Sequence, residues 1–226
     1  MNETVTPDAK RRGGRRERRD LRTRPDHAML PTLAGQLPLT EPMDQEQIER
    51  IDAASLDILE EVGVVFRDDI ALEDWRKAGA DVRGERVHLD RGLVKSLIKT
   101  IPSEITLHAR NPEKTVALGG RQSIFIPMTG APYLRDLEDV RRAPTLDDLA
   151  TFHKLAHMLP AMHSSAHHIV EPMDHPISHR HLRITHSSML YSDKTFMGMT
   201  TSGQNAEDVL DMCAILFGEE YLETHA

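Results

Sequence analysis

The chain has 226 residues, of which 28% are charged and 39% hydrophobic, and a formal net charge of -8 at pH 7. No stretch approaches the ~18 consecutive apolar residues of a membrane-spanning helix, and no apolar run follows the basic N-terminus as in a secretory signal. The acidic balance argues against nucleic acid as a partner of the protein body. A single cysteine, Cys213, excludes an internal disulfide and favours a reducing compartment. We therefore expect a globular protein of the cytoplasm.

Residues 1–42 are predicted to form a basic arm followed by an extended strap. Eight arginines crowd between residues 10 and 24, and four prolines follow before residue 43. Runs of like charge are usually solvated. We expect a flexible arm that docks on a neighbouring acidic subunit or on the body of its own chain. Nonspecific nucleic-acid binding through counterion release is the less favoured alternative.

Residues 43–119 are predicted to form an α+β cap. Apolar residues recur at the helical period after Asp44, a suitable N-cap, and Gly63 marks the helix end. Shorter helices are expected over 69–79 and 91–100. A hairpin turning at Arg83-Gly84 is expected between them.

Residues 120–226 contain a repeating pattern of a short apolar strand, a loop and an amphipathic helix. The expected strands are 124–127, 161–165 and 195–200, and the expected helices are 146–159, 178–191 and 205–217. Such repeats indicate parallel strands with crossover helices. Their loops then gather at one edge, where α/β sheets and barrels bind ligands. We call these loops the rim; the pattern predicts an α/β, barrel-like fold with a ligand there.

Four rim residues are candidate substrate-binding groups. Tyr133 follows a tight Gly-Ala-Pro turn and offers an aromatic face to a quaternary ammonium group, although packing alone would also explain it. Glu171 stands among apolar residues, where desolvation would raise its pKa and suit it to a cation or to proton transfer. A carboxylate that stabilises the loop is an equal alternative. His167 and His168 open the second rim loop.

Nine of the thirteen histidines lie between residues 153 and 186, which invites a metal hypothesis. His153 and His157 share a helix face, but the intervening residues lack the glutamate of a zincin motif and no cysteine is near. We therefore expect no metal site. Signatures for nucleotide hydrolysis, dinucleotide binding and α/β-hydrolase chemistry are also missing. Asp193, between a helix and the third strand, is expected to stabilise a turn.

Several segments resemble one family of enzymes. They are residues 126–137 (IPMTGAPYLRDL), residues 170–172 (VEP) with 180–182 (RHL), residues 192–198 (SDKTFMG), residues 107–112 (LHARNP) and the arm RRGGRR at 11–16. Together, and in this order, they resemble the trimethylamine methyltransferase family. The resemblance covers nearly the whole chain.

The resemblance implies a TIM (β/α)8-type barrel, with only about the first three βα units present after the α+β region. It implies transfer of a methyl group from trimethylamine or a betaine-type quaternary amine to Co(I) of a separate corrinoid protein. No cofactor would be bound directly, the catalytic residues would lie beyond residue 226, and the enzyme would form a homo-oligomer.

Family members are roughly twice this length, and three units cannot close eight strands. A truncated chain is therefore expected. Two alternatives stay open: a non-catalytic protein that binds betaines or amines, and an inactive fragment.

Overall fold

The computed structural model describes residues 28–225 apart from residue 39, so the arginine-rich arm lies outside the described residues. These residues divide into two compact units. The first, which we call the N-terminal unit, comprises 34–105 and 118–122. The second, the C-terminal unit, comprises 106–117, 123–225 and the described residues before 34. Both combine helices with short strands, which confirms the mixed α/β class.

The N-terminal unit begins with helix α2, Gln45–Asp57, which has a reciprocal cap. Asp44 Oδ1 accepts from the Gln47 amide at 2.8 Å, and Gln47 Oε1 accepts from the Asp44 amide at 3.1 Å. A π-helical turn, η1 (Ile58–Val62), leads to Gly63, whose φ is 70°. A Cβ at Gly63 would lie 2.6 Å from the Val87 carbonyl oxygen, so only glycine fits. The predicted helix and its end are confirmed.

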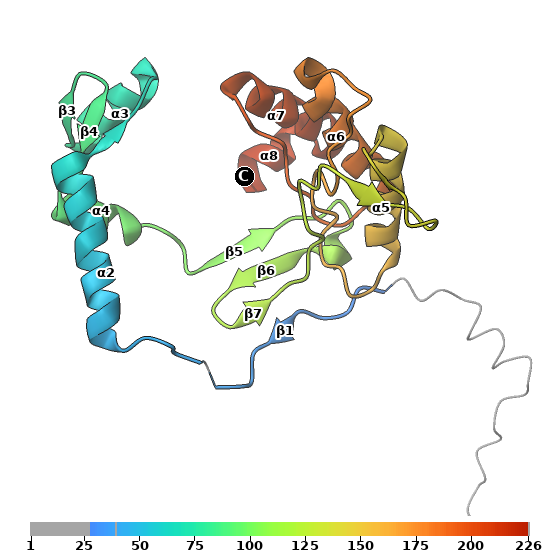
Figure 1. Cartoon of the computed structure of the whole chain (residues 1–226), viewed down its shortest axis with the longest axis horizontal. Coiled ribbons are helices and arrows are strands. Elements are labelled where there is room, and N and C mark those ends of the chain that lie inside the picture. The colour runs from blue at the N-terminus through green and yellow to red at the C-terminus, as the bar shows by residue number, and fades with distance from the viewer. Residues whose placement is uncertain (1–27, 39, 226) are drawn as a thin grey trace, which may run out of the picture. The chain divides into compact units, whose positions relative to one another are not determined.

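A small antiparallel sheet follows in the same unit (Figure 1). Its strands are β2 (Val64–Val65), β3 (Asp81–Arg83) and β4 (Arg86–His88), in the order β2-β4-β3. The β3–β4 pair is the predicted hairpin. Helices α3 (Asp69–Ala78) and α4 (Arg91–Ile98) flank it in sequence, each capped by an aspartate side chain. The core consists of Leu72, Val87 and Leu89 with partly buried neighbours that include Phe66 and Trp75.

Two short ribbons contain all the points at which the chain passes from one unit to the other. Strand β5 (Glu104–Leu107) pairs with β6 (Val116–Gly119), and β1 (Leu33–Ala34) pairs with β7 (Gln122–Ser123). The 3-10 turn η2, Pro112–Lys114, lies between β5 and β6.

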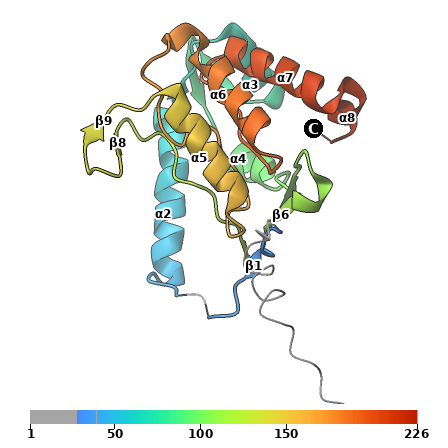
Figure 2. The same ribbon diagram turned by 90° about the vertical axis from the view of Figure 1, so that its right-hand side faces the viewer.

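The C-terminal unit is dominated by four helices packed in sequence order. They are α5 (Leu146–Met158), α6 (Ile177–Tyr191), α7 (Gly203–Phe217) and α8 (Glu219–His225). Each packs against the next (Figure 2). The bounds of α5, α6 and α7 agree with the predicted helices to within two residues. Buried Leu149, Val170 and Ile184 form the core of this unit. Within the described residues, no helix combines the length and apolarity that crossing a bilayer requires.

The predicted strands of the repeat are wrong in extent but right in arrangement. Residues 124–127, 161–165 and 195–200 contain no regular strand. Parallel bridges instead join Ser164 to Thr195 and Ala131 to Val170. The three segments therefore lie side by side and parallel, with the 163–171 segment in the middle. In the described part of the chain they do not close into a barrel.

Side chains form hydrogen bonds with backbone groups that would pair with a neighbouring strand in a regular sheet. The Phe125 amide donates to His163 Nδ1 at 2.9 Å, and the Ser164 and Ser165 hydroxyls both donate to the Thr195 carbonyl, at 2.9 and 3.2 Å. Ala166 has a φ of 56°, which breaks the extended conformation. Side-chain partners of this kind compete with strand pairing, so the ladders stop after single bridges.

Buried Lys194 joins α5 to the middle segment. Its side chain is only 1% exposed, and Nζ donates to the carbonyls of Ala156, Leu159 and Met162 at 2.8, 2.8 and 2.7 Å. These carbonyls belong to the C-terminal end of α5 and to the turn that follows it. Burial lowers the pKa of Lys194 to about 8, which leaves it protonated at neutral pH. The neighbouring Asp193 pairs with Lys114 Nζ at 2.5 Å, in accord with its expected structural role.

Replacing Lys194 with methionine should lower the free energy of unfolding by about 3 kcal/mol or more, because buried carbonyls lose their donor. Urea titration followed by circular dichroism measures the loss. Lys154→Met, at an exposed position of α5 where Nζ lies 4.3 Å from the Tyr191 ring centroid, is the control and should cost less than about 1 kcal/mol. Equal losses in the two variants would contradict this role of Lys194.

Candidate functional site

The first two rim loops are joined by backbone hydrogen bonds. Gly130 N donates to the His168 carbonyl at 2.7 Å, and Glu171 N donates to the Ala131 carbonyl at 2.9 Å. Gly130 has a φ of 79°, and a Cβ there would lie 3.4 Å from His168 Nε2. Glycine therefore permits the turn and the close approach of the histidine ring. These contacts place Gly130, His167, His168 and Glu171 in one neighbourhood.

Glu171 is held by an arginine from helix α6. Its Oε1 accepts from Arg180 Nη1 at 2.6 Å, while Arg180 Nε and Nη2 donate to the His175 carbonyl at 3.2 and 2.8 Å. The second carboxylate oxygen lies 3.9 Å from His168 Nε2, beyond hydrogen-bond distance. One oxygen of Glu171 is thus fixed, and the other faces the histidine. The side chains of Glu171 and Arg180 are 21% and 12% exposed.

The rings of His167 and His168 form an edge-to-face pair, with centroids 3.9 Å apart. Burial is the main reason why the pKa of His167 falls to about 4, and the neighbouring His168 and His153 lower it further. His167 is therefore neutral at pH 7. The pair offers ring surface rather than positive charge from His167, which suits the neighbourhood of a cation.

Tyr133 lies at the rim but has a different partner. Its ring is 52% exposed and is covered by the Arg141 guanidinium, 4.0 Å from the ring centroid. Arg141 belongs to strand β9 (Arg141–Arg142), which pairs with β8 (Leu134–Arg135). The structure thus assigns one face of Tyr133 to a cation of the protein itself. The arrangement joins His167, His168 and Glu171, while Tyr133 sits in the adjoining hairpin.

Sequence reasoning missed two residues of this neighbourhood. Arg180 follows Glu171 by nine residues, and no helical or strand period links the two positions. His153 lies four residues before His157 on α5, but its Nε2 is 2.7 Å from the His167 carbonyl oxygen, whereas His157 Nδ1 is 3.1 Å from Asp193 Oδ1. The two histidines therefore serve different neighbourhoods. Within residues 28–225, leaving out residue 39, no group of three or more metal-ligating side chains has a suitable arrangement.

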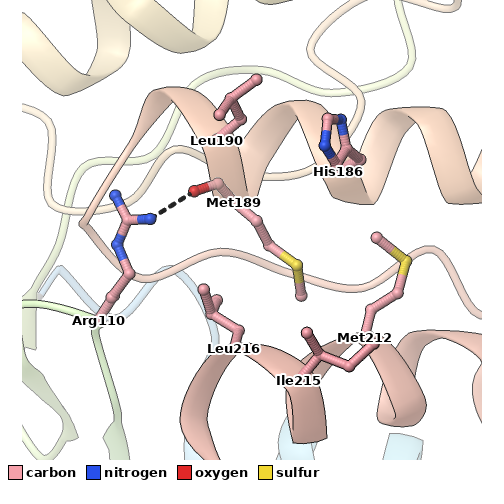
Figure 3. Close-up of a pocket in the computed structure, with 7 residues that line it drawn as sticks. All are labelled: Arg110, His186, Met189, Leu190, Met212, Ile215 and Leu216. Atoms are coloured by element: carbon pink, nitrogen blue, oxygen red, sulfur yellow. Dashed lines mark hydrogen bonds between the residues drawn. The ribbon is translucent and has the colours of Figure 1, made fainter.

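A pocket lies between α6 and α7 and shares no residue with the rim. Figure 3 shows Arg110 donating to the Met189 carbonyl at one end of it, at 2.9 Å. Its volume is about 360 Å³, and its lining is Arg110, His186, Met189, Leu190, Met212, Ile215 and Leu216. The lining is mostly apolar and contains no carboxylate. A carboxylate that could attract a cationic or zwitterionic ligand is therefore found at the rim, in Glu171, and not in this pocket.

The C-terminal unit is thus an α/β unit with parallel segments and a rim of histidines and a carboxylate–arginine pair. The chain belongs to the trimethylamine methyltransferase family, whose model matches residues 11–226. This confirms the resemblance seen in the sequence.

Three relatives have been named for their activities. A glycine betaine methyltransferase of Desulfitobacterium hafniense (strain Y51) is 43% identical over 182 residues, 80% of this chain and 38% of the relative. A trimethylamine methyltransferase of D. hafniense (strain DSM 10664 / DCB-2) is 26% identical over 77% of this chain and 36% of the relative. A proline betaine:corrinoid methyltransferase of Eubacterium limosum is 33% identical over 48% and 22%. The chain thus spans less than two-fifths of the length of these relatives.

The lowered pKa of His167 predicts acid sensitivity. The pKa of His167 is about 4 in the folded protein, compared with the ordinary value of 6.5 that applies to the unfolded chain. Between pH 4 and 6.5 the unfolded state therefore binds more protons than the folded state. The free energy of unfolding consequently falls as the pH drops from 6.5 to 4. His167→Gln should flatten this dependence, measured by urea unfolding at pH 7, 5.5 and 4.5. His186→Gln, on the exposed side of α6, should keep the wild-type slope. If the free energy of unfolding of His167→Gln depended on pH as steeply as that of wild type, His167 would not be a source of the acid sensitivity.

Proposed function

We propose that the protein is a methyltransferase that takes a methyl group from a betaine-type quaternary amine. The acceptor is the cobalt of a corrinoid carried by a separate partner protein, in the cytoplasm. The 43% identity to a glycine betaine methyltransferase supports the substrate class, and the name of the proline betaine:corrinoid enzyme supports the acceptor. Both relatives are longer than this chain, so the proposal concerns the protein to which these residues belong.

The observation that carries the substrate class is the ion pair of Glu171 and Arg180 at the rim. A betaine is a zwitterion, with a quaternary ammonium and a carboxylate. The Glu171–Arg180 pair likewise has one negative and one positive charge, with Oε1 and Nη1 2.6 Å apart, and its net charge is zero. A bare cation would gain less there, because Arg180 opposes the attraction of Glu171. The pair therefore favours a zwitterion over a simple methylated ammonium ion.

We place the ammonium group of the substrate near Glu171 Oε2 and the ring of His168. A quaternary ammonium cannot donate a hydrogen bond, so it is held by charge and by ring faces. Tyr133, whose ring is covered by Arg141 on one face only, adds further ring surface. Methyl transfer needs the departing nitrogen and the methyl carbon aligned with the acceptor, so orientation is the main contribution of such a site.

We also propose that the longer protein forms a (β/α)8 barrel. Three parallel segments connected through α5 and α6 are the arrangement with which a (β/α)8 barrel begins. The remaining strands would come from the further length that the relatives have. In a closed barrel, the short bridges of residues 163–171 would be part of a continuous sheet.

Glu171→Gln should weaken glycine betaine binding about tenfold, a loss of about 1.4 kcal/mol, because the carboxylate charge is removed. Isothermal titration calorimetry measures the affinity, and formation of dimethylglycine with a reduced corrinoid protein measures transfer. Glu207→Gln, at an exposed position of α7, is the matched control.

The two measurements separate the alternatives. Binding of glycine betaine without any dimethylglycine would identify a non-catalytic betaine-binding protein. Absence of both binding and product from wild type would overturn the proposed function.

A further inference from the structure

A fully buried histidine of helix α5 connects three parts of the C-terminal unit. His153 has 0% exposed surface. Its Nε2 lies 2.7 Å from the His167 carbonyl oxygen, and its Nδ1 lies 2.9 Å from Ser187 Oγ. Ser188 Oγ is also 3.2 Å from Nε2. One imidazole thus contacts the second rim loop and two hydroxyls of α6.

The partners determine which nitrogen carries the proton. A carbonyl only accepts hydrogen bonds, so Nε2 must donate to the His167 carbonyl. Burial lowers the pKa of His153, which keeps the ring neutral. Nδ1 therefore has a lone pair and accepts from the Ser187 hydroxyl. Both ring nitrogens are used, and this directional pattern is one that no apolar side chain of similar size supplies.

The carbonyl that His153 holds lies at the start of the rim loop. Two residues of backbone are fixed in succession, because His153 binds the His167 carbonyl and Gly130 N binds the His168 carbonyl at 2.7 Å. The preceding Ala166 has a φ of 56°, so the chain turns there. Between the turn and these two bonds, the peptide that carries both rim histidines has little freedom. Glu171 follows three residues later.

We propose that His153 is a positioning residue for the substrate site: through the His167 carbonyl it sets the orientation of the His167–His168 pair relative to Glu171. This rests on the proposed binding of a quaternary amine at the rim. His153 itself does not touch the substrate, because His167 lies between them in the hydrogen-bonded chain. Its effect is on binding geometry, transmitted by a single donor on a rigid helix.

Two substitutions separate the donor from the rest of the side chain. In His153→Gln the amide nitrogen reaches the place of Nε2 and still donates to the His167 carbonyl. In His153→Asn the shorter side chain reaches only the place of Nδ1, so it retains a partner for Ser187 and loses the carbonyl. Both variants keep a polar, uncharged group in the same buried position, so they are matched in desolvation.

Glycine betaine should bind His153→Gln within about threefold of wild type and His153→Asn at least tenfold more weakly, as measured by calorimetry. Nuclear magnetic resonance of ring-labelled histidine provides a second readout. The ring signals of His167 and His168, assigned with the His167→Gln variant and a His168→Gln variant, should shift in His153→Asn and stay near wild type in His153→Gln. Urea unfolding checks that both variants are folded.

The outcomes separate this inference from the proposed function. Wild-type affinity and unchanged ring signals in His153→Asn would overturn the positioning role. Equal weakening in both variants would also overturn it, because the donor to the carbonyl would then not be the operative contact. If wild type neither bound glycine betaine nor formed dimethylglycine, the proposed function would fail, while the ring signals would still test whether His153 orients the pair.

Discussion

The backbone of residues 163–171 is hydrogen-bonded on both sides, and the C-terminal unit is arranged about it. On one side, His163 N donates to the Phe125 carbonyl at 2.8 Å and Gly130 N donates to the His168 carbonyl. On the other, Ser165 N donates to the Thr195 carbonyl at 2.9 Å. This middle segment therefore aligns the first and third segments. It also carries the residues that form the proposed site.

Buried polar side chains complete this arrangement where regular strands do not. A buried carbonyl or amide without a partner is costly, and here histidine, serine and lysine side chains supply the partners. His163 accepts from the Phe125 amide, and its Nε2 lies 3.1 Å from the Leu30 carbonyl. The density of histidines thus reflects, in part, backbone support. A cluster that invites a metal hypothesis in the sequence proves to be distributed over several hydrogen-bonded positions.

The same support gives the rim its chemical character. His167 is kept neutral by burial, while Glu171 is kept in place by Arg180. The result is a small region with a paired charge and ring surface. Such a region matches a zwitterionic amine better than an anion or a nucleotide. This is the class of substrate that we propose for the protein.

The local elements of this protein can be predicted from its sequence. Caps such as Asp44 with Gln47 and Thr145 with Asp148 define helix starts, because each is made by residues three positions apart. The order and parallel sense of the three segments also followed from the repeat. The sequence also predicts the rim as a place for ligands, with Tyr133, His167, His168 and Glu171 as candidates.

The contacts between side chains at the rim depend on the tertiary structure. Arg180 meets Glu171, His153 meets the His167 carbonyl and Arg141 covers Tyr133. Each contact joins residues on different elements, so no periodic pattern in the sequence encodes it. The strands are reduced to single bridges for the same reason, because the competing serine and histidine side chains bond to backbone atoms of a different segment. Local periodicity predicts elements, whereas contacts between elements depend on how those elements pack.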